Sequence, residues 1–241
     1  MIFGERPNMF NFFKKKPLFE FYTNNPAALK HHPVQPVSNE LSKILKKVKR
    51  DETETSIKKC PGIIHYNKLG YIVYAWQDIE IETEDNAEAF SWKTPLNIND
   101  FETKIDINGP TLSEIMYMKP ELFYNYFPRP DTLKCVIKIN TPWSVKMPDG
   151  YSLIYAPFWY DNETRFSVIP GLFDSNEHNY LNVQIYWHVI GGKEIIRAGT
   201  PLVRLIPIKN EDFDFVSRMS TREENLEYKM KMYQQNKGIY S

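Results

Sequence analysis

Cysteine is scarce in this sequence, and long apolar runs are absent. Cys60 and Cys135 are the only cysteines among 241 residues, which excludes a disulfide-stabilised fold and fits a reducing compartment. No apolar stretch approaches the roughly 18 residues that a membrane-spanning helix needs. The start of the chain has no apolar segment followed by a small-residue cleavage site. We therefore expect a soluble protein inside the cell that makes no use of a membrane.

The sequence also lacks net charge, with 30 basic and 30 acidic residues. A neutral balance gives no general attraction to nucleic acid or to a membrane surface, so neither is expected as a partner. The charge is nevertheless uneven: residues 1–50 carry roughly +7, and residues 70–132 carry roughly −8. Two interpretations of this uneven charge remain open. Both segments are simply solvated surfaces, or the basic segment docks on an acidic surface of its own chain or of a neighbour.

Aromatic residues are abundant, at 15% of the chain, and they gather in strand-like runs, which favours β structure. Residues 1–37 contain five prolines and are predicted to form an extended N-terminal arm. Within this arm PLFEFY (17–22) is apolar and aromatic. We expect that stretch to lie against a surface, and a neighbouring subunit is a candidate for that surface.

Residues 38–132 are predicted to be a helical and β-rich extension. Ser38 can cap a helix over 38–49, and a second short helix begins near Pro61 and ends before Gly70. Two further stretches, TLSEIMYM and PELFYNYF, are ambiguous between short helix and loop. These two stretches are residues 111–118 and 120–127. Strands are predicted over 70–84 and 90–98.

The segment 133–210 is predicted to be the β core. It consists of short apolar segments separated by Pro, Gly, Asp or Asn, a spacing typical of a sandwich or barrel. Residues 211–241 are predicted to contain a terminal helix, with Ser220 and Glu223 as its capping box. The apolar stripe of this helix is narrow and suits contact with a core edge or a partner. It consists of Leu226, Met230 and Tyr233.

Three pieces of the core resemble the dUTPase and dCTP-deaminase superfamily. They are MPDGYSLIYAP (147–157), IPGLFDSNEHNYLNVQI (169–185) and IIRAGTPLVRLIPI (195–208), in the family's order and spacing. The resemblance implies a β-clip fold, a compact distorted barrel that usually forms trimers. A longer stretch, 141–174 together with 60–79, is also similar to a group of phage and bacterial proteins to which no activity is assigned.

The resemblance implies roles for single residues. Asp174 matches the aspartate that orients the attacking water in the enzymes, and Tyr180 matches the tyrosine near the base, although it lies six residues on rather than three. Phe158, Trp159 and Tyr160 stand where the family has a phosphate-binding serine and arginine. The glycine-rich tail that closes over the nucleotide is also missing, which leaves Arg165 as a nearby cation together with Arg204. A triphosphate needs several such groups.

Each of these residues also has a plain structural interpretation. Asp174 can close a turn with its own side chain, and the three consecutive aromatic residues at 158–160 can pack against the extension. His178 lies near two carboxylates in a polar loop, a pattern that predicts a turn rather than a metal site. Gly171 and Gly199 are expected at tight turns, where glycine is favoured when φ is positive.

These observations predict a non-catalytic oligomeric assembly or interaction protein on a dUTPase-like fold. It would be a trimer and a phage virion or accessory component, with other phage proteins as possible partners, located in the host cytoplasm or in the virion. The alternative is a nucleotide-binding protein or a diverged nucleotide hydrolase, with Asp174 as the catalytic candidate. Tyr180, Arg165 and the aromatic run would then bind the ligand. No cofactor is expected, except Mg²⁺ in that alternative.

Overall fold

The structure is a computed structural model, and it divides the chain into two compact units, residues 1–210 and 211–241. The first unit is mainly β and holds three antiparallel sheets, which confirms the predicted fold class. The predicted arm, extension and core all contribute strands to these sheets. The residues that the structure describes are 16–40, 43, 60–95, 115–118, 131–158, 163–174 and 180–239.

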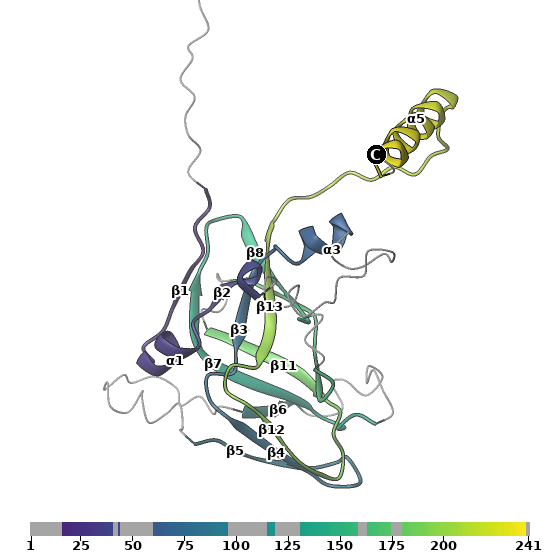
Figure 1. The fold of residues 1–241 in the computed structure, drawn as a ribbon. Helices are drawn as coiled ribbons and strands as arrows, with labels where there is room; N and C mark the ends of the chain where they lie inside the picture. Colours follow the sequence, from purple (N-terminus) through teal and green to yellow (C-terminus); the bar gives the residue numbers. More distant parts are fainter. Residues whose placement is uncertain are drawn as a thin grey trace, which may run out of the picture. The chain divides into compact units, whose positions relative to one another are not determined.

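The first sheet is built around two long strands that carry much of the core. Its strand order is β1-β7-β11-β9, and β6 also pairs with β7. Figure 1 shows β7 and β11 side by side across the middle of the unit. The strands are β1 (Glu20–Tyr22), β6 (Ile115–Met118), β7 (Val136–Lys146), β9 (Phe166–Val168) and β11 (Tyr180–Trp187). The strand at 115–118 settles one stretch for which helix and loop were left open.

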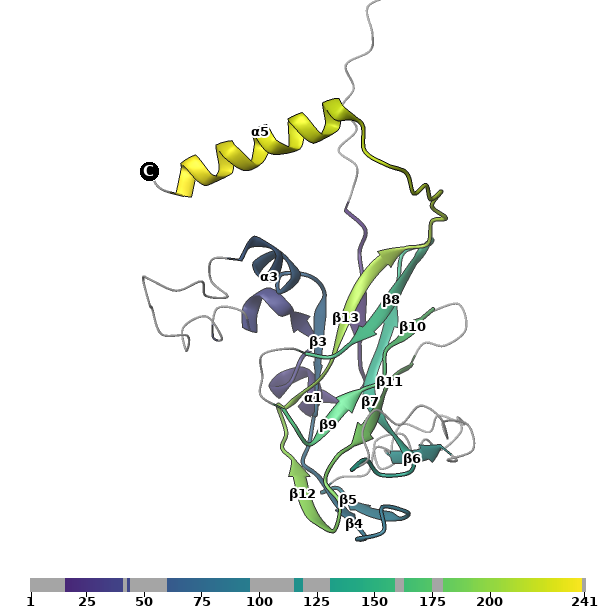
Figure 2. The ribbon, with the colours of Figure 1, turned by 90° about the vertical axis from the view of Figure 1, so that its right-hand side faces the viewer.

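The second sheet has the order β10-β8-β13-β3-β2, and the third has the order β12-β4-β5. Figure 2 shows the third sheet at one end of the unit. The second sheet consists of β2 (Gln35–Pro36), β3 (Tyr71–Tyr74), β8 (Tyr151–Ala156), β10 (Gly171–Phe173) and β13 (Pro201–Lys209). The third consists of β4 (Ile79–Thr83), β5 (Phe90–Lys93) and β12 (Gly192–Ile196). The predicted strand over 70–84 is therefore two strands, in different sheets.

Side-chain alternation along the strands explains the core. In β11, Leu181, Val183, Ile185 and Trp187 are buried in one large cluster, while the intervening residues face the other side of the sheet. Cys135 lies in the same cluster, and burial raises the pKa of its thiol to about 11. This cysteine therefore acts as a small apolar residue rather than as a reactive thiol.

The strand β7 runs through Pro142, where the sequence predicted a break between two segments. The ladder between β7 and β11 shifts register there, between the pairs Tyr180–Ser144 and Asn182–Asn140. On the other side, β1 pairs only with residues 144–146 and β6 only with 136–139. Pro142 thus occupies an irregular point of the ladder, where a residue without an N–H group is tolerated.

The N-terminal arm lies on its own chain. Phe19 and Phe21 pack against the main core, and each ring contacts Tyr71. The helix α1 (Pro26–His31) begins at Asn25, whose side chain accepts a hydrogen bond from the Ala28 amide. The expectation that a neighbouring subunit covers PLFEFY is therefore wrong for its two phenylalanines.

The remaining predicted helices differ in how far the structure describes them. Residues 37–40 are helical, but most of the predicted helix over 38–49 lies outside the described residues, as does 120–127. The helix α3 (Pro61–Tyr66) lies where the sequence predicts it, and Gly70 beyond it has a φ of 79°. Of the described helices, none is long and apolar enough to span a membrane.

The second unit contains the terminal helix α5 (Arg222–Ile239). Its capping box lies one residue later than predicted: the Glu224 amide donates to the Thr221 hydroxyl, and the Thr221 amide donates to the Glu224 carboxylate. Hydrogen bonds from Arg218 and from the Thr221 amide lower the pKa of Glu224 to about 2. Thr221 and Glu224, rather than Ser220 and Glu223, therefore define where this helix begins.

Arg204 is a fully buried cation in the second sheet, with no exposed surface. Its guanidinium donates to the Leu69 carbonyl at 3.0 and 2.8 Å and to the Tyr66 carbonyl, and it lies 4.0 Å above the Tyr66 ring. Burial lowers the pKa of this group. Arg204 therefore ties the end of α3 and the turn after it to the strand β13.

We predict that Arg204→Met lowers the free energy of unfolding by about 2–3 kcal/mol, because the Tyr66 and Leu69 carbonyl groups lose the hydrogen bonds from a buried guanidinium. Chemical denaturation measures this change. The matched control is Arg197→Met, since Arg197 forms an exposed ion pair with Asp78 at 2.6 Å, and this change should cost less than about 1 kcal/mol. Equal losses for both variants would contradict the role given to Arg204.

Gly199→Val should lower the free energy of unfolding by more than about 1 kcal/mol, because Gly199 has a φ of 84° that a β-branched residue rarely adopts. A side chain there would also approach the His32 ring at 3.1 Å. Thermal melting measures the loss. Gly171→Val is the control, since Gly171 has no positive φ and open space beside it. An unchanged melting temperature for Gly199→Val would refute this prediction.

Candidate functional site

The main candidate site is a pocket of about 190 Å³ at the point where the chain crosses from the first sheet to the second. One wall is the edge of β11, and the other is formed by β8, β10 and the residues that lead into β10. The pocket is lined by Tyr155, Ile169, Pro170, Gly171, Leu172, Phe173, Asn182 and Gln184.

The pocket exists because β9 is short. It pairs with β11 only from Ile185 to Trp187, and one further hydrogen bond of 2.9 Å joins the Ile169 amide to the Gln184 carbonyl. Pro170 cannot continue this ladder because it has no N–H group. The alternation of an antiparallel ladder then directs the Asn182 amide and carbonyl toward the side that β9 has left. In the described part of the chain, no strand pairs with Asn182 on that side.

Tyr155 contributes a buried hydroxyl group to this pocket. Its side chain is 8% exposed, and its hydroxyl has no hydrogen-bond partner of normal geometry in the described residues. Burial raises its pKa, and the nearby Asn182 amide opposes that rise only in part. The group is therefore a neutral phenol that can both donate and accept. A buried hydroxyl without a partner is costly, so a ligand that supplied one would bind favourably.

Gly171 keeps the pocket open. It was expected in a tight turn, but it is the first residue of β10 and pairs with Tyr155, so the turn assignment is wrong. A Cβ atom at this position would meet no atom within 4 Å. The backbone conformation at this position therefore does not require glycine. The absence of a side chain leaves space beside the edge of β11.

The chemistry of the pocket suits a small planar molecule with a polar edge. Apolar side chains such as Ile169 and Phe173 form the walls, while the Asn182 backbone and the Tyr155 hydroxyl supply donors and an acceptor. This combination of apolar walls and few polar groups is typical of small-ligand sites. Among the described residues, no Lys or Arg lines the pocket, so this part of the lining provides no cation for a phosphate group.

The structure places the two residues carried over from the family motif beside the pocket rather than in its lining. Asp174 follows β10 and is half-buried, with its own polar interactions. Tyr180 begins β11, is 56% exposed and pairs with Ser144. Neither belongs to the lining residues.

The aromatic run and Arg165 are engaged elsewhere or lie outside the described residues. Phe158 is buried in a small cluster with Val37, Ile72 and Tyr74, so it packs in the interior rather than lining a ligand site. Trp159 and Tyr160 lie outside the described residues, as does His178.

Arg165 is held by Glu163 and by a backbone carbonyl. Its guanidinium contacts the Glu163 carboxylate at 2.6 and 2.9 Å and also donates to the Ile195 carbonyl. Burial opposes ionisation of Glu163, but the hydrogen bonds from Arg165 outweigh it and hold the carboxyl pKa below its usual value. Arg165 and Arg204 therefore both have structural partners. Among the described residues, no three His, Cys, Asp or Glu side chains are grouped to hold a metal ion.

Sequence reasoning missed Tyr155, Asn182 and Gln184 as lining residues. Tyr155 reads as an ordinary core residue of a strand, and the two amides read as the solvated face of β11. The one usable signal was Pro170 directly after a three-residue strand, since proline ends a ladder. It indicated that the neighbouring strand would lose its partner there.

The chain matches no protein-family model and no curated protein. Solved structures of phage dUTPases are similar to it in fold. The dUTPase from phage phi11 of S. aureus aligns at 10% identity with a TM-score of 0.39, over 85% of this chain and 98% of that chain. A mutant of that enzyme, described as coordinating a structural Mg(II) ion, aligns over 99% of its length with the same identity and TM-score. The dUTPase of Staphylococcus bacteriophage 80alpha, described as controlling transfer of virulence genes, aligns at 9% identity with a TM-score of 0.39, over 85% of this chain and 99% of that chain.

Proposed function

We propose that this protein is a non-catalytic assembly or interaction protein that forms oligomers, most simply trimers, through its β unit and its C-terminal unit. One observation carries the proposal: exposed apolar side chains are concentrated in residues 211–241. Nine of the sixteen large hydrophobic side chains that are exposed among the described residues belong to this short unit. They are Phe213, Phe215, Val216, Met219, Leu226, Tyr228, Met230, Met232 and Tyr233.

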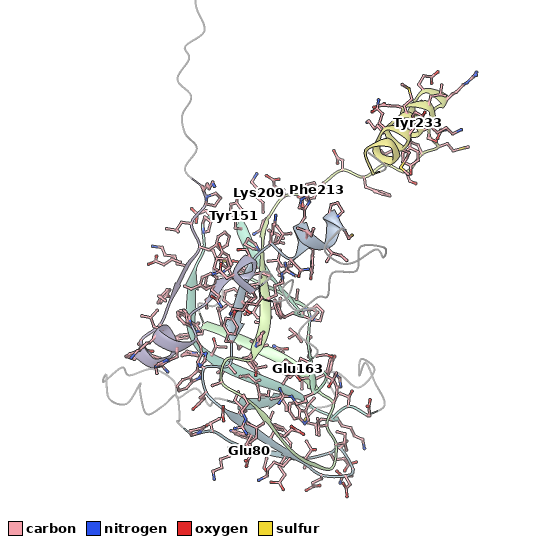
Figure 3. All side chains as sticks on the ribbon, in the orientation of Figure 1. Glu80, Tyr151, Glu163, Lys209, Phe213 and Tyr233 are labelled. Atoms are coloured by element: carbon pink, nitrogen blue, oxygen red, sulfur yellow. The ribbon has the colours of Figure 1, made fainter. Side chains whose placement is uncertain are left out.

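The extended part of this unit has the pattern of a strand without a sheet. Residues 210–220 form no regular element, and in DFDF (212–215) the acidic and apolar side chains alternate as they do along a half-buried strand. Phe215 is 90% exposed and Met219 is 92% exposed. Figure 3 labels Phe213 on this segment and Tyr233 on α5. Apolar groups of this size are rarely left in water by a monomer.

Burial of these side chains against another copy would stabilise an oligomer. At about 25 cal/mol per Å² of apolar surface, a few hundred Å² contributes several kcal/mol before the cost of ordering the chains. The stripe of Leu226, Met230 and Tyr233 on α5 extends the same apolar surface, since all three residues are more than half exposed. The trimer itself rests on the resemblance to the dUTPase superfamily and is part of the proposal.

Charge supports a second contact between copies. The segment 1–15 carries Arg6, Lys14 and Lys15, and the hairpin of β4 and β5 presents a row of acidic residues. Glu80 and Glu82 of this row already contact Lys193, at 2.9 and 3.6 Å. A basic segment of a neighbouring copy would complement the remaining carboxylates. Such exposed pairs weaken as salt is added.

A second candidate function is the binding of a small planar ligand such as a nucleoside, in the pocket beside β10. The observation that favours it is the Tyr155 hydroxyl, which is buried at the pocket with the Asn182 amide beside it and no hydrogen bond of normal geometry among the described residues. Hydrolysis of a triphosphate is a weaker candidate, because none of the described residues that line this pocket is a cation. Mg²⁺ would be required only for that chemistry.

We expect light scattering to give a mass well above 28.5 kDa at micromolar concentration. Phe213→Ser with Phe215→Ser should lower the oligomer's association constant by at least tenfold, because both rings are exposed in the single chain. The control is Leu29→Ser, which removes an exposed apolar side chain from α1, outside the C-terminal unit. A monomer for the unchanged protein, or equal effects of both variants, would refute the proposal.

Deletion of residues 1–15 is a better test of the basic segment than deletion of the whole arm, because residues from Phe19 onward belong to the core. The shortened protein should still associate, with a weaker dependence on salt.

For the pocket, we expect deoxyuridine to raise the melting temperature of the unchanged protein but not that of Gly171→Val, which fills the space beside β11 without a clash. Leu18→Val is the control, since Leu18 is exposed and does not line the pocket. With dUTP and Mg²⁺ we expect no release of pyrophosphate. Release that disappears in Asp174→Ala would replace the assembly role with the hydrolase alternative.

A further inference from the structure

A hydroxyl, an imidazole and a second hydroxyl form a continuous chain of contacts away from the pocket. The Ser167 hydroxyl lies 2.7 Å from Nε2 of His188, and Nδ1 of His188 lies 3.0 Å from the Thr132 hydroxyl. Ser167 is exposed on the three-residue strand β9, whereas His188 and Thr132 are buried. The exposed end of this chain of contacts is therefore a potential nucleophile, and the buried end can orient the ring.

The backbone fixes all three residues. The His188 amide donates to the Arg165 carbonyl at 2.7 Å, which aligns His188 with the start of β9. The Leu133 amide donates to the Trp187 carbonyl at 2.9 Å, which holds Thr132 beside the ring. Ser167 pairs directly with Tyr186, two residues before His188, so its side chain lies on the same face as the ring. Ser167 lies on the paired strand β9, His188 directly follows β11 and Thr132 lies in the bend before β7. The backbone hydrogen bonds at these strand ends hold the contact between hydroxyl and ring in place.

We propose that Ser167 is a reactive nucleophile, activated by His188, that accepts an acyl group from an activated ester. Thr132 is a positioning residue: it accepts a hydrogen bond from Nδ1–H, which leaves Nε2 as the acceptor for the Ser167 proton. This inference goes beyond the assembly role and uses none of the residues of the pocket or of the C-terminal unit.

The reaction can be written without any further reagent. The Ser167 Oγ attacks the carbonyl carbon of the ester, and its proton passes to Nε2 of His188. The new C–O bond forms as the bond to the leaving group breaks, and the leaving group departs as an alkoxide or takes the proton from Nε2. The product is an acyl-serine and a free alcohol.

The surroundings of Ser167 explain why an activated ester is required. The Ile169 amide bonds to the Gln184 carbonyl and the His188 amide bonds to the Arg165 carbonyl. Because hydrogen-bonded and non-hydrogen-bonded pairs alternate along an antiparallel ladder, the Ser167–Tyr186 pair between them is a hydrogen-bonded pair, which engages the Ser167 amide. That amide is therefore not available to stabilise a tetrahedral oxyanion. The neighbouring Arg165 is bound to Glu163. A site with a nucleophile and a base, whose neighbouring described donors are already engaged, reacts with good leaving groups and then keeps the acyl group.

The test is acylation of the full-length protein by p-nitrophenyl acetate. We expect a single stoichiometric burst of nitrophenolate, with the acetyl group located on Ser167 by peptide mass mapping. Ser167→Ala should abolish the burst, and His188→Gln should slow it at least tenfold, since a positioned general base contributes about 10²–10⁴. Ser91→Ala is the matched control, because Ser91 is exposed on strand β5 and should not contribute.

The pH profile separates activation from a structural role. In the unchanged protein the burst rate should rise as the His188 ring loses its proton, and this rise should vanish in His188→Gln. Thr132→Val should slow the burst while the acetyl group still maps to Ser167. A burst that persists in Ser167→Ala, or one that His188→Gln leaves unchanged with its pH profile, would overturn the proposal. Because Ser167 is exposed, Ser167→Ala is expected to fold, and its melting temperature checks this.

Discussion

The buried guanidinium of Arg204 is the interaction on which the second sheet depends. An ionised group taken out of water must be compensated by hydrogen bonds, and here backbone carbonyls of Tyr66 and Leu69 and the Tyr66 ring compensate it. No carboxylate takes part in these contacts. The same bonds give the Tyr66 carbonyl at the end of α3 a donor in addition to the Leu69 amide, and give the Leu69 carbonyl of the following turn a donor. Helix, turn and strand β13 are therefore stabilised together. Since β3 follows this turn and pairs with β13, the contact also sets the position of β3.

A second constraint is the length mismatch between neighbouring strands. β11 has eight residues and β9 has three, so within the described ranges most of one edge of β11 has no strand beside it. The chain uses Pro170 to leave the first sheet and Gly171 to begin β10 in the second. The pocket and the Ser167–His188 contact both follow from this difference in length. The pocket lies where the pairing of β9 with β11 has ended, and the Ser167–His188 contact lies where the two strands are still paired.

The fold class could be predicted from the sequence because it depends on local patterns. Alternating Leu181, Val183 and Ile185 indicate a strand wherever they occur, and the Pro61–Gly70 interval indicates a short helix. Pro142 was read wrongly because the tolerance of a strand for proline depends on its partners, which are 40 residues away in sequence. Arg204 could not be predicted as buried, since a charged residue in a strand normally indicates a solvated face.

The candidate sites were less predictable because they are made by residues that are distant in sequence. Thr132 meets His188 only because β7 and β11 are neighbours, and no local pattern near either residue indicates the contact. Asp174 shows the opposite error. Its match to a motif was visible in the sequence, yet no Lys or Arg is among the described residues that line the nearby pocket. A motif defines an activity only when its distant partners are also present, and here the exposed apolar surface of residues 211–241 is the feature that calls for a partner.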